Sequence, residues 1–264
     1  MKNPVRLALI GYGAMARALQ QRLAHGTPTL DVGAVLVQET GVVEPPLLEF
    51  SRIDQLLDWR PTLVAECAGH SAVTDVVPHL LGAGIDVVIA SVGALSDDRL
   101  LSHLMQASQD GGGRLIVPSG AVGGLDALRA ARDTGLDRVV YTGKKPPRAW
   151  AETPASDAFD LDAIVSPTTI FEGSAREAAR LYPKNANVTA AVALAGAGFD
   201  DTTVRLLADP TADRNEHEIS ARGAFGEINI RLRNVPLPEN PKTSMLAALS
   251  LELEVRRVAQ VLAL

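Results

Sequence analysis

The chain has 264 residues, of which 47% are hydrophobic, enough for a large core or for two domains. Its net charge of −6 argues against nucleic acid as the main partner. Cys67 is the only cysteine, which excludes an internal disulfide and a cysteine-based zinc site and favours a reducing cytoplasm. No run approaches the roughly 18 uninterrupted apolar residues of a membrane span, and no His, Asp and Glu cluster has metal-ligand spacing. We therefore expect a cytoplasmic protein without metal.

The first predicted element is a buried strand that ends at a glycine-rich turn. Residues 5–16 read VRLALIGYGAMA, and a helical pattern follows from Arg17. The turn is G-x-G-x-x-A between a strand and a helix, which is typical of dinucleotide binding. Gly11 permits a tight reversal, Gly13 lets the backbone approach a pyrophosphate, and Ala16 is small enough for the helix to pack on the strand. A purely structural turn is the alternative.

The helix after this turn would present unpaired N–H groups and the positive end of its dipole to the phosphates. We therefore predict cofactor contacts at Gly11, Gly13, Ala14 and Met15. The same stretch can be compared with a signal peptide, but its two glycines and the charged helix that follows argue against that interpretation.

Strands alternate with helices up to residue 118, which predicts right-handed βαβ units and a parallel sheet. Asp97 is a candidate N-cap, and the glycines at 111–113 should end the helix that it starts. The expected strands are 31–37, 63–68, 86–90 and 114–117; the expected helices are 53–57, 71–81 and 97–109.

The pattern changes past Gly120, where strands dominate and helices are fewer. This favours an α+β domain with a mixed, mostly antiparallel sheet behind an N-terminal Rossmann domain with a doubly wound parallel sheet. The expected helices are 123–131, 175–180 and 187–197, the strands 138–143, 204–208, 216–221 and 226–232, and a surface loop 148–167.

We predict three parts of the chain: a dinucleotide-binding domain at 1–118, a substrate-binding, catalytic and dimerisation domain at 119–240, and a C-terminal segment at 241–264. Within this last segment, residues 242–264 form one amphipathic helix, with apolar residues at spacings of three and four. Its expected role is to return the chain to the first domain.

His217 is the main candidate for acid–base chemistry. In a strand over 216–221, alternation puts His217 on the apolar face with Ile219 and Ala221. An inward imidazole suits a general acid or base, although an edge histidine without a task fits the same pattern. His70 follows a strand at the edge where ligands bind in doubly wound folds, so it can line the cofactor site or belong to a helix-capping turn.

Several polar loop residues are further candidates, each with a plain structural alternative. The loop with Ser119 can face a nicotinamide or act as a hinge, and Asn187 can be a helix cap. Lys144 and Lys145 can hold substrate carboxylates or be solvated charge. Thr243 or Ser244 can cap the last helix or meet an anion.

Six segments in order along the chain together resemble one family, the NAD(P)-dependent L-aspartate dehydrogenases. They are GYGAMA at 11–16, PSGAVGGLDAL at 118–128, YTGKKPPRAW at 141–150, FEGSAREAARLYPKNANVTA at 171–190, HEISARGAFG at 217–226 and NPKTS at 240–244.

The resemblance implies oxidative deamination of L-aspartate to iminosuccinate, which hydrolyses to oxaloacetate and ammonia or feeds quinolinate and NAD synthesis. It also implies a homodimer. Carried over by motif, His217 is the active-site histidine, and Ala121 and Asn187 contact the cofactor. The two substrate carboxylates need cationic or N–H partners, for which Ser119, Lys144 and Lys242 are candidates.

The second strand ends near Glu39, and no arginine follows to hold a 2′-phosphate. A carboxylate there would repel that phosphate, so we predict NAD as the cofactor, with NADP as the alternative. Rival functions are a homoserine-dehydrogenase-like or dihydrodipicolinate-reductase-like enzyme, and a nicotinamide-binding sensor without turnover.

Overall fold

The computed structural model describes residues 5–24, 30–43 and 45–259. The chain divides into two compact units, Met1–Pro118 with Ala247–Leu264, and Ser119–Leu246. Each unit has its own sheet, and we describe each in turn.

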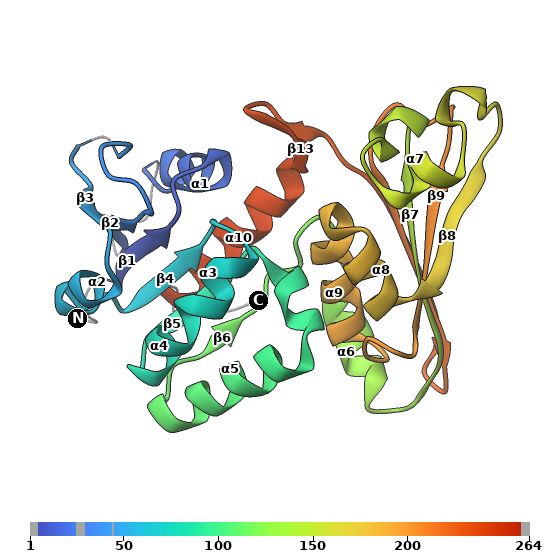
Figure 1. Cartoon of the computed structure of the whole chain (residues 1–264). Helices are drawn as coiled ribbons and strands as arrows, with labels where there is room; N and C mark the ends of the chain where they lie inside the picture. The colour runs from blue at the N-terminus through green and yellow to red at the C-terminus, as the bar shows by residue number, and fades with distance from the viewer. Residues whose placement is uncertain (1–4, 25–29, 44, 260–264) are drawn as a thin grey trace. The chain divides into compact units, whose positions relative to one another are not determined.

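The first unit contains a six-stranded parallel sheet in the order β3-β2-β1-β4-β5-β6 (Figure 1). The order reverses between β1 and β4, which is the switch point where doubly wound sheets bind ligands at the carboxyl ends of their strands. This confirms the predicted Rossmann class. The strands are β1 (Val5–Ile10), β2 (Leu30–Leu36), β3 (Leu48–Phe50), β4 (Leu63–Glu66), β5 (Asp86–Ile89) and β6 (Leu115–Ile116).

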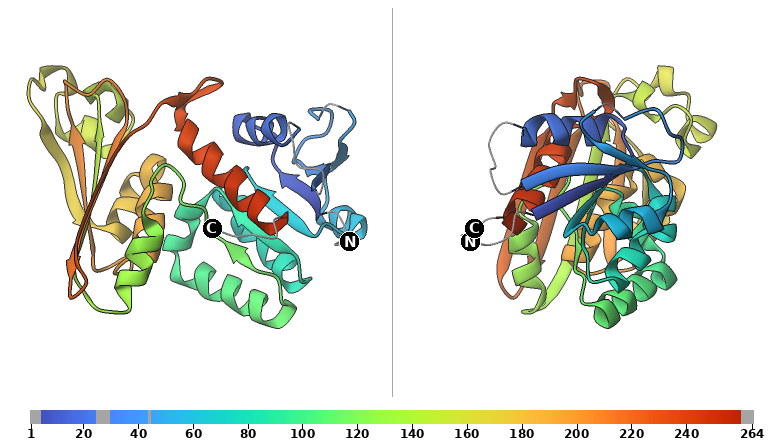
Figure 2. Two further views of the ribbon diagram at one scale, coloured as in Figure 1. Left: turned by 180° about the vertical axis from the view of Figure 1, so that it is seen from behind. Right: turned by 90° about the vertical axis from the view of Figure 1, so that its left-hand side faces the viewer.

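Helices cover this sheet because their apolar residues recur on one face. In α1, Ala16 and Leu19 are fully buried against Leu7 and Leu9 of β1. From the far end of the chain, α10 (Met245–Ala259) adds Leu251 to the same core, and Figure 2 shows this helix lying along the sheet. The other helices of the unit are α1 (Ala14–Leu23), α2 (Ile53–Trp59), α3 (His70–Asp75), α4 (Val77–Gly82), α5 (Asp98–Gly111) and a 3₁₀ helix, Val92–Ser96.

Two details of the first unit differ from the sequence prediction and one agrees. The single helix predicted over 71–81 is divided into α3 and α4 at Val76, because Pro78 has no N–H to donate to the carbonyl four residues earlier and its ring crowds that carbonyl. The short edge strand β3 was not predicted. Asp97 caps α5 as expected, accepting hydrogen bonds from the N–H groups of Arg99 and Leu100.

The second unit contains a five-stranded sheet in the order β11-β10-β7-β9-β8. Only β7 and β9 are parallel, so the sheet is mixed and mostly antiparallel, as predicted. The strands are β7 (Leu136–Lys145), β8 (Thr168–Ser174), β9 (Thr202–Ala208), β10 (Glu216–Gly223) and β11 (Gly226–Arg233). A short hairpin follows, β12 (Pro236–Leu237) and β13 (Asn240–Ser244).

One face of this sheet is covered by α6 (Leu125–Arg132), α8 (Ala175–Leu181) and α9 (Ala186–Ala195) (Figure 1). Most of α9 is buried, and its small alanine side chains let it lie between the sheet and the other two helices. The side chains on the inner face of the sheet are therefore held in a packed layer.

The second unit also differs from prediction. The loop predicted over 148–167 contains α7 (Pro154–Ala158) and a short 3₁₀ helix, Leu161–Ala163. Strand β8 was not predicted, because a register shift between Thr169 and Phe171 interrupts its alternation.

The final predicted helix starts later than expected. Residues 242–244 lie in β13, so α10 begins at Met245, and the Ser244 hydroxyl accepts a hydrogen bond from the N–H of Leu246. Residues 260–264 of the predicted helix lie outside the described residues. Over the ranges that the structure describes, no helix is both long enough and apolar enough to cross a membrane.

Candidate functional site

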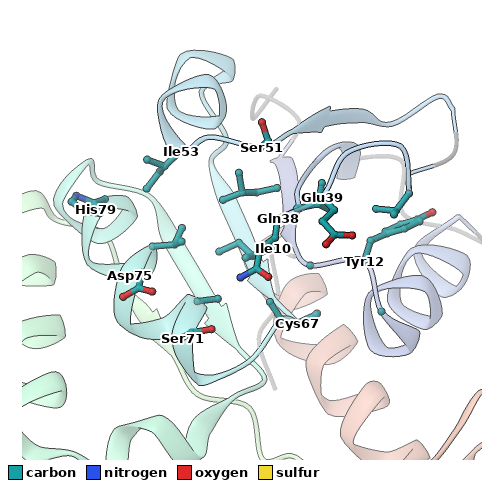
Figure 3. A pocket seen from close by; sticks show the side chains of 18 of the residues that line it. Ile10, Tyr12, Gln38, Glu39, Ser51, Ile53, Cys67, Ser71, Asp75 and His79 are labelled. Atoms are coloured by element: carbon teal, nitrogen blue, oxygen red, sulfur yellow. The ribbon is translucent and has the colours of Figure 1, made fainter.

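A cavity of about 800 Å³ opens at the carboxyl end of β1. Gly11 and Gly13 line it together with the ends of β2 and β4. Figure 3 shows Gln38 and Glu39 lining it from the end of β2, with Asp75 of α3 and His79 of α4 among the residues that line it elsewhere. Its volume lies within the range of roughly 300–1,000 Å³ for small-molecule sites.

The two glycines of the turn have different physical roles. Gly11 has φ +80°, and a Cβ there would lie 2.8 Å from the Cβ of Ala68, so both backbone conformation and space require glycine. A Cβ on Gly13 would meet nothing within 4 Å. The fold therefore does not require glycine at this position. Gly13 borders the cavity, so its missing side chain leaves room for a ligand.

The first turn of α1 begins directly after Gly13. Gly13 is the N-cap, and the turn contains no acidic side chain, so its N–H groups and the helix dipole can meet an anion. Ala14 and Met15 form this turn. The Met15 side chain packs against the core, which leaves its backbone N–H as the group that can approach a phosphate.

Glu66 shapes the neighbouring wall of the cavity, and sequence reasoning missed it. Its fully buried carboxylate accepts hydrogen bonds from the N–H groups of Ala68 and Gly69, both at 2.7 Å, and from the N–H and hydroxyl of Ser91, both at 3.0 Å. These bonds fix the turn after β4, which packs against Gly11. The available signal was a glutamate within an otherwise apolar strand.

The end of β2 carries Glu39, an exposed carboxylate that lines the cavity. Arg17 lines it as well, and its guanidinium donates a hydrogen bond to the carbonyl of Tyr12 at 3.0 Å. His70 is the first residue of α3 and is exposed. The described residues that line the cavity do not include it.

His217 lies on the inner face of the second unit's sheet, with Ile219 and Ala221, as the alternation predicts. Only 6% of its surface is exposed. Its Nδ1 shares a hydrogen bond of 2.8 Å with the hydroxyl of Tyr141, and the two rings stack with centroids 6.0 Å apart. Burial, and secondarily the positive charge of Lys145, lower the pKa of His217 to about 4.

Tyr141 was not predicted, because it lies 76 residues from His217 in sequence and meets it only through the pairing of β7 with β10. Burial raises its pKa, so the phenol stays protonated. Gly143 lies directly opposite His217, and a Cβ there would be 2.9 Å from the Tyr141 hydroxyl. The missing side chain at Gly143 leaves space for this hydroxyl.

The two lysines that end β7 point to opposite faces of the sheet. Lys145 shares the face of Tyr141 and Gly143 by alternation. Lys144 pairs in register with Glu216 on the other face, and its ammonium lies 3.6 Å from the carboxylate of Glu218. The structure therefore brings Lys145, not Lys144, to the face of His217.

The remaining predicted residues of the second unit are dispersed over its loops and helix ends. Ala121 is buried, and its carbonyl accepts a hydrogen bond of 2.7 Å from the side chain of Asn234, which sequence reasoning missed. Ser119 begins the same loop. Asn187 is exposed in the first turn of α9. Lys242 lies in β13, and its side chain is outside the described part of the chain.

The described residues contain no group of three or more His, Cys, Asp and Glu side chains that could hold a metal ion. The polar groups of the two units instead suit an anionic dinucleotide in the first and proton transfer in the second.

Comparison with known families covers both units. Residues 126–258 match the family described as aspartate dehydrogenase, C-terminal, and residues 11–118 match the homoserine dehydrogenase NAD-binding domain. L-aspartate dehydrogenase of Cupriavidus necator is 47% identical over 252 residues, covering 93% of this chain and 94% of the relative. That of Pseudomonas aeruginosa is 45% identical, with the same coverage of both chains.

Solved structures agree on the fold. Aspartate dehydrogenase from Thermotoga maritima superposes with a TM-score of 0.79 at 24% identity, covering 98% of this chain and 99% of that one. A hyperthermophilic archaeal homoserine dehydrogenase in complex with NADPH superposes with a TM-score of 0.62 at 12% identity, covering 96% of this chain and 97% of that one.

Proposed function

Because this chain belongs to the L-aspartate dehydrogenase family, we propose that it oxidises L-aspartate to iminosuccinate with a nicotinamide cofactor. The observation that carries the proposal is the similarity to curated L-aspartate dehydrogenases over 93% of the chain, which includes both units. The iminosuccinate then hydrolyses to oxaloacetate and ammonia.

The residues at the cavity of the first unit fit a dinucleotide. Gly13 leaves open space where a side chain would stand, and the first-turn N–H groups of α1 can bind the pyrophosphate. When bound, the nicotinamide accepts a hydride from the substrate Cα. From the family motifs, Ala121 and Asn187 are proposed as further cofactor contacts.

His217 is proposed to carry the proton. At neutral pH the amine of L-aspartate is protonated, and it must lose a proton before the C=N bond can form. Because the pKa of His217 is lowered to about 4, its imidazole is neutral and can accept that proton. We assign the tautomer in which Nδ1 donates to the Tyr141 oxygen, and this assignment leaves Nε2 as the accepting atom.

The same imidazole can serve the hydrolysis of the imine. Loss to solvent of the proton taken from the substrate amine restores the neutral ring. A water molecule that attacks the imine carbon can then give a proton to Nε2, and His217 can pass that proton to the amine as ammonia leaves. His217 therefore acts as base in the oxidation and in the attack of water, and as acid when ammonia leaves.

Formation of NADH on mixing the protein with NAD and L-aspartate tests the proposed activity. L-Homoserine is the control, because the NAD-binding family matched by the first unit is named for homoserine dehydrogenase. NADH formation with L-homoserine but not with L-aspartate would favour the homoserine dehydrogenase alternative. Tight binding of NADH without turnover of any amino acid would favour a sensor.

NAD is the proposed cofactor, with NADP as the alternative. Glu39 presents a carboxylate where a 2′-phosphate would need a cation, and the Arg17 guanidinium is engaged with the Tyr12 carbonyl. The ratio of kcat/KM for the two nucleotides measures the preference. A strong preference for NADP would contradict this assignment.

The cellular role and assembly are also part of the proposal. Released iminosuccinate is proposed to feed quinolinate and NAD synthesis, so expression of the chain should relieve quinolinate dependence in a strain that lacks its own source of iminosuccinate. A homodimer is proposed from the family, and light scattering should give twice the mass of one chain. Continued quinolinate dependence would argue against the cellular role, and the mass of a single chain would argue against the homodimer.

A further inference from the structure

A second cavity, of about 300 Å³, lies within the second unit beside the end of β7. This is the lower end of the range of roughly 300–1,000 Å³ for small-molecule sites. Polar and aromatic side chains meet in its wall, from the end of β7, the segment after it, and the region between α8 and α9. They are Lys145, Trp150, Glu152, Arg180, Tyr182 and Asn185.

The ammonium group of Lys145 is held in place at this cavity. It donates a hydrogen bond to the side-chain oxygen of Asn185 and lies 5.0 Å from the centroid of the Trp150 ring. Trp150 is itself fixed, because it is almost fully buried and its indole N–H donates to the carbonyl of Leu207 at 3.1 Å. These contacts position the cation before any ligand arrives.

The charge balance at the cavity favours an anion. Lys145 and Arg180 contribute two positive charges and Glu152 one negative charge, which leaves one net positive charge in a chain whose total is −6. A carboxylate is one anion that can accept charge-assisted hydrogen bonds from a lysine ammonium.

Sheet register connects this cavity with the proposed catalytic residue. Lys145 is two residues from Gly143, which lies opposite His217, so Lys145 and His217 are diagonal neighbours on one face, roughly 7–8 Å apart. The positive charge of Lys145 also acts on the imidazole, since it contributes to the lowered pKa of His217. The described lining of the cavity includes Lys145 and not His217, so the link between them is their shared face and short separation.

We infer that Lys145, positioned by Asn185 and Trp150, binds the side-chain carboxylate of a four-carbon dicarboxylate substrate in this cavity. The inference rests on the proposed function for the identity of the substrate. The reacting carbon, with its amine, belongs beside His217, so the other end of the molecule extends toward Lys145. Lys144, on the opposite face and next to Glu218, is the rival for this role.

The test compares Lys145→Met with Lys144→Met. Methionine keeps most of the apolar stem and removes the ammonium, with its charge and its hydrogen bond to Asn185. For Lys145→Met we expect the KM for L-aspartate to rise roughly 10- to 100-fold, the loss typical of a hydrogen bond to a charged group. The KM for NAD should stay within about threefold. For Lys144→Met we expect less than a threefold change in either KM.

Succinate supplies a readout without turnover, because it has both carboxylates and no amine to oxidise. Calorimetric titration should show the Kd of succinate rising in Lys145→Met by a factor similar to that of KM. Asn185→Ala, which leaves the lysine in place but releases it, should raise both values by a smaller factor. Melting temperatures check that the variants fold.

Unchanged aspartate KM and unchanged succinate affinity in Lys145→Met would overturn the inference, as would an equal loss in Lys144→Met. Failure of the wild-type protein to oxidise L-aspartate would instead reject the proposed function. In that case the succinate titration of the same variants still decides whether Lys145 binds a dicarboxylate.

Discussion

His217 combines an imidazole that its lowered pKa keeps neutral at pH 7 with one ring nitrogen held by a hydrogen bond. Burial supplies the first, and the Tyr141 hydroxyl supplies the second. Gly143 contributes by leaving space for that hydroxyl. Two residues of β7 therefore hold the orientation of the imidazole, and burial sets its charge.

Replacing His217 by Ala should lower kcat by roughly two to four orders of magnitude, the range for loss of a general acid or base. Tyr141→Phe should lower kcat only about two- to tenfold, because it removes one neutral hydrogen bond. The KM for L-aspartate should change little in Tyr141→Phe. Steady-state kinetics of both variants check this order, and near-normal kcat in His217→Ala would remove His217 from the mechanism.

The pH dependence of kcat/KM follows from the lowered pKa of His217. The neutral imidazole is the active form, and it persists until the pH falls toward about 4, instead of being lost around the ordinary value of 6.5. We therefore expect the acid limb of kcat/KM to lie below pH 6.5. An acid limb at pH 6.5 or above would mean that burial does not lower the pKa of His217.

Sequence reasoning correctly predicted the face on which His217 lies, because period-two alternation is local. It missed Tyr141 and Glu66, whose roles depend on pairing between distant strands or on backbone N–H groups in a turn. It could not separate Lys144 from Lys145, since only the register of β7 against β10 assigns each lysine to a face.

At the scale of elements, the two glycines of the turn between β1 and α1 have different roles: the fold requires one, and the other leaves room for a ligand. Gly11 needs its positive φ and has no room for a Cβ, whereas Gly13 has open space beside it. The local pattern of strand, glycines and helix was sufficient to predict this turn.

Gly13→Val should therefore weaken NAD binding strongly while leaving the melting temperature nearly unchanged. Gly11→Ala should lower the melting temperature, because the new Cβ would lie 2.8 Å from that of Ala68 and the backbone conformation disfavours alanine. Calorimetry with NAD and thermal unfolding check the pair. An unchanged NAD dissociation constant in Gly13→Val would argue against this turn as the pyrophosphate site.

Three strands that sequence reasoning missed share a physical cause. β3 is a three-residue edge strand, β8 contains a register shift, and β13 is a short hairpin strand directly before α10. Each is too short or too irregular to show a clear period, and each is specified by its neighbour in the sheet. The long alternating strands and periodic helices were predicted because the spacing of apolar residues is visible within each segment's own sequence.

At the scale of the whole molecule, the chain contains a dinucleotide cavity in one unit and a buried imidazole with a lysine-lined cavity in the other. Both units match families named for dehydrogenases, and L-aspartate dehydrogenases match over almost the whole chain. The fold class followed from the order of elements alone, whereas the substrate followed only from the family resemblance, because many reactions use this architecture.

Oxidation at the Cα of L-aspartate is the central claim, and transfer of the hydrogen on that carbon tests it most directly. L-Aspartate deuterated at Cα should yield reduced cofactor that contains one deuterium at the nicotinamide C4, together with oxaloacetate and ammonia in equal amounts. Reduced cofactor without deuterium, or no reduction at all, would contradict the account.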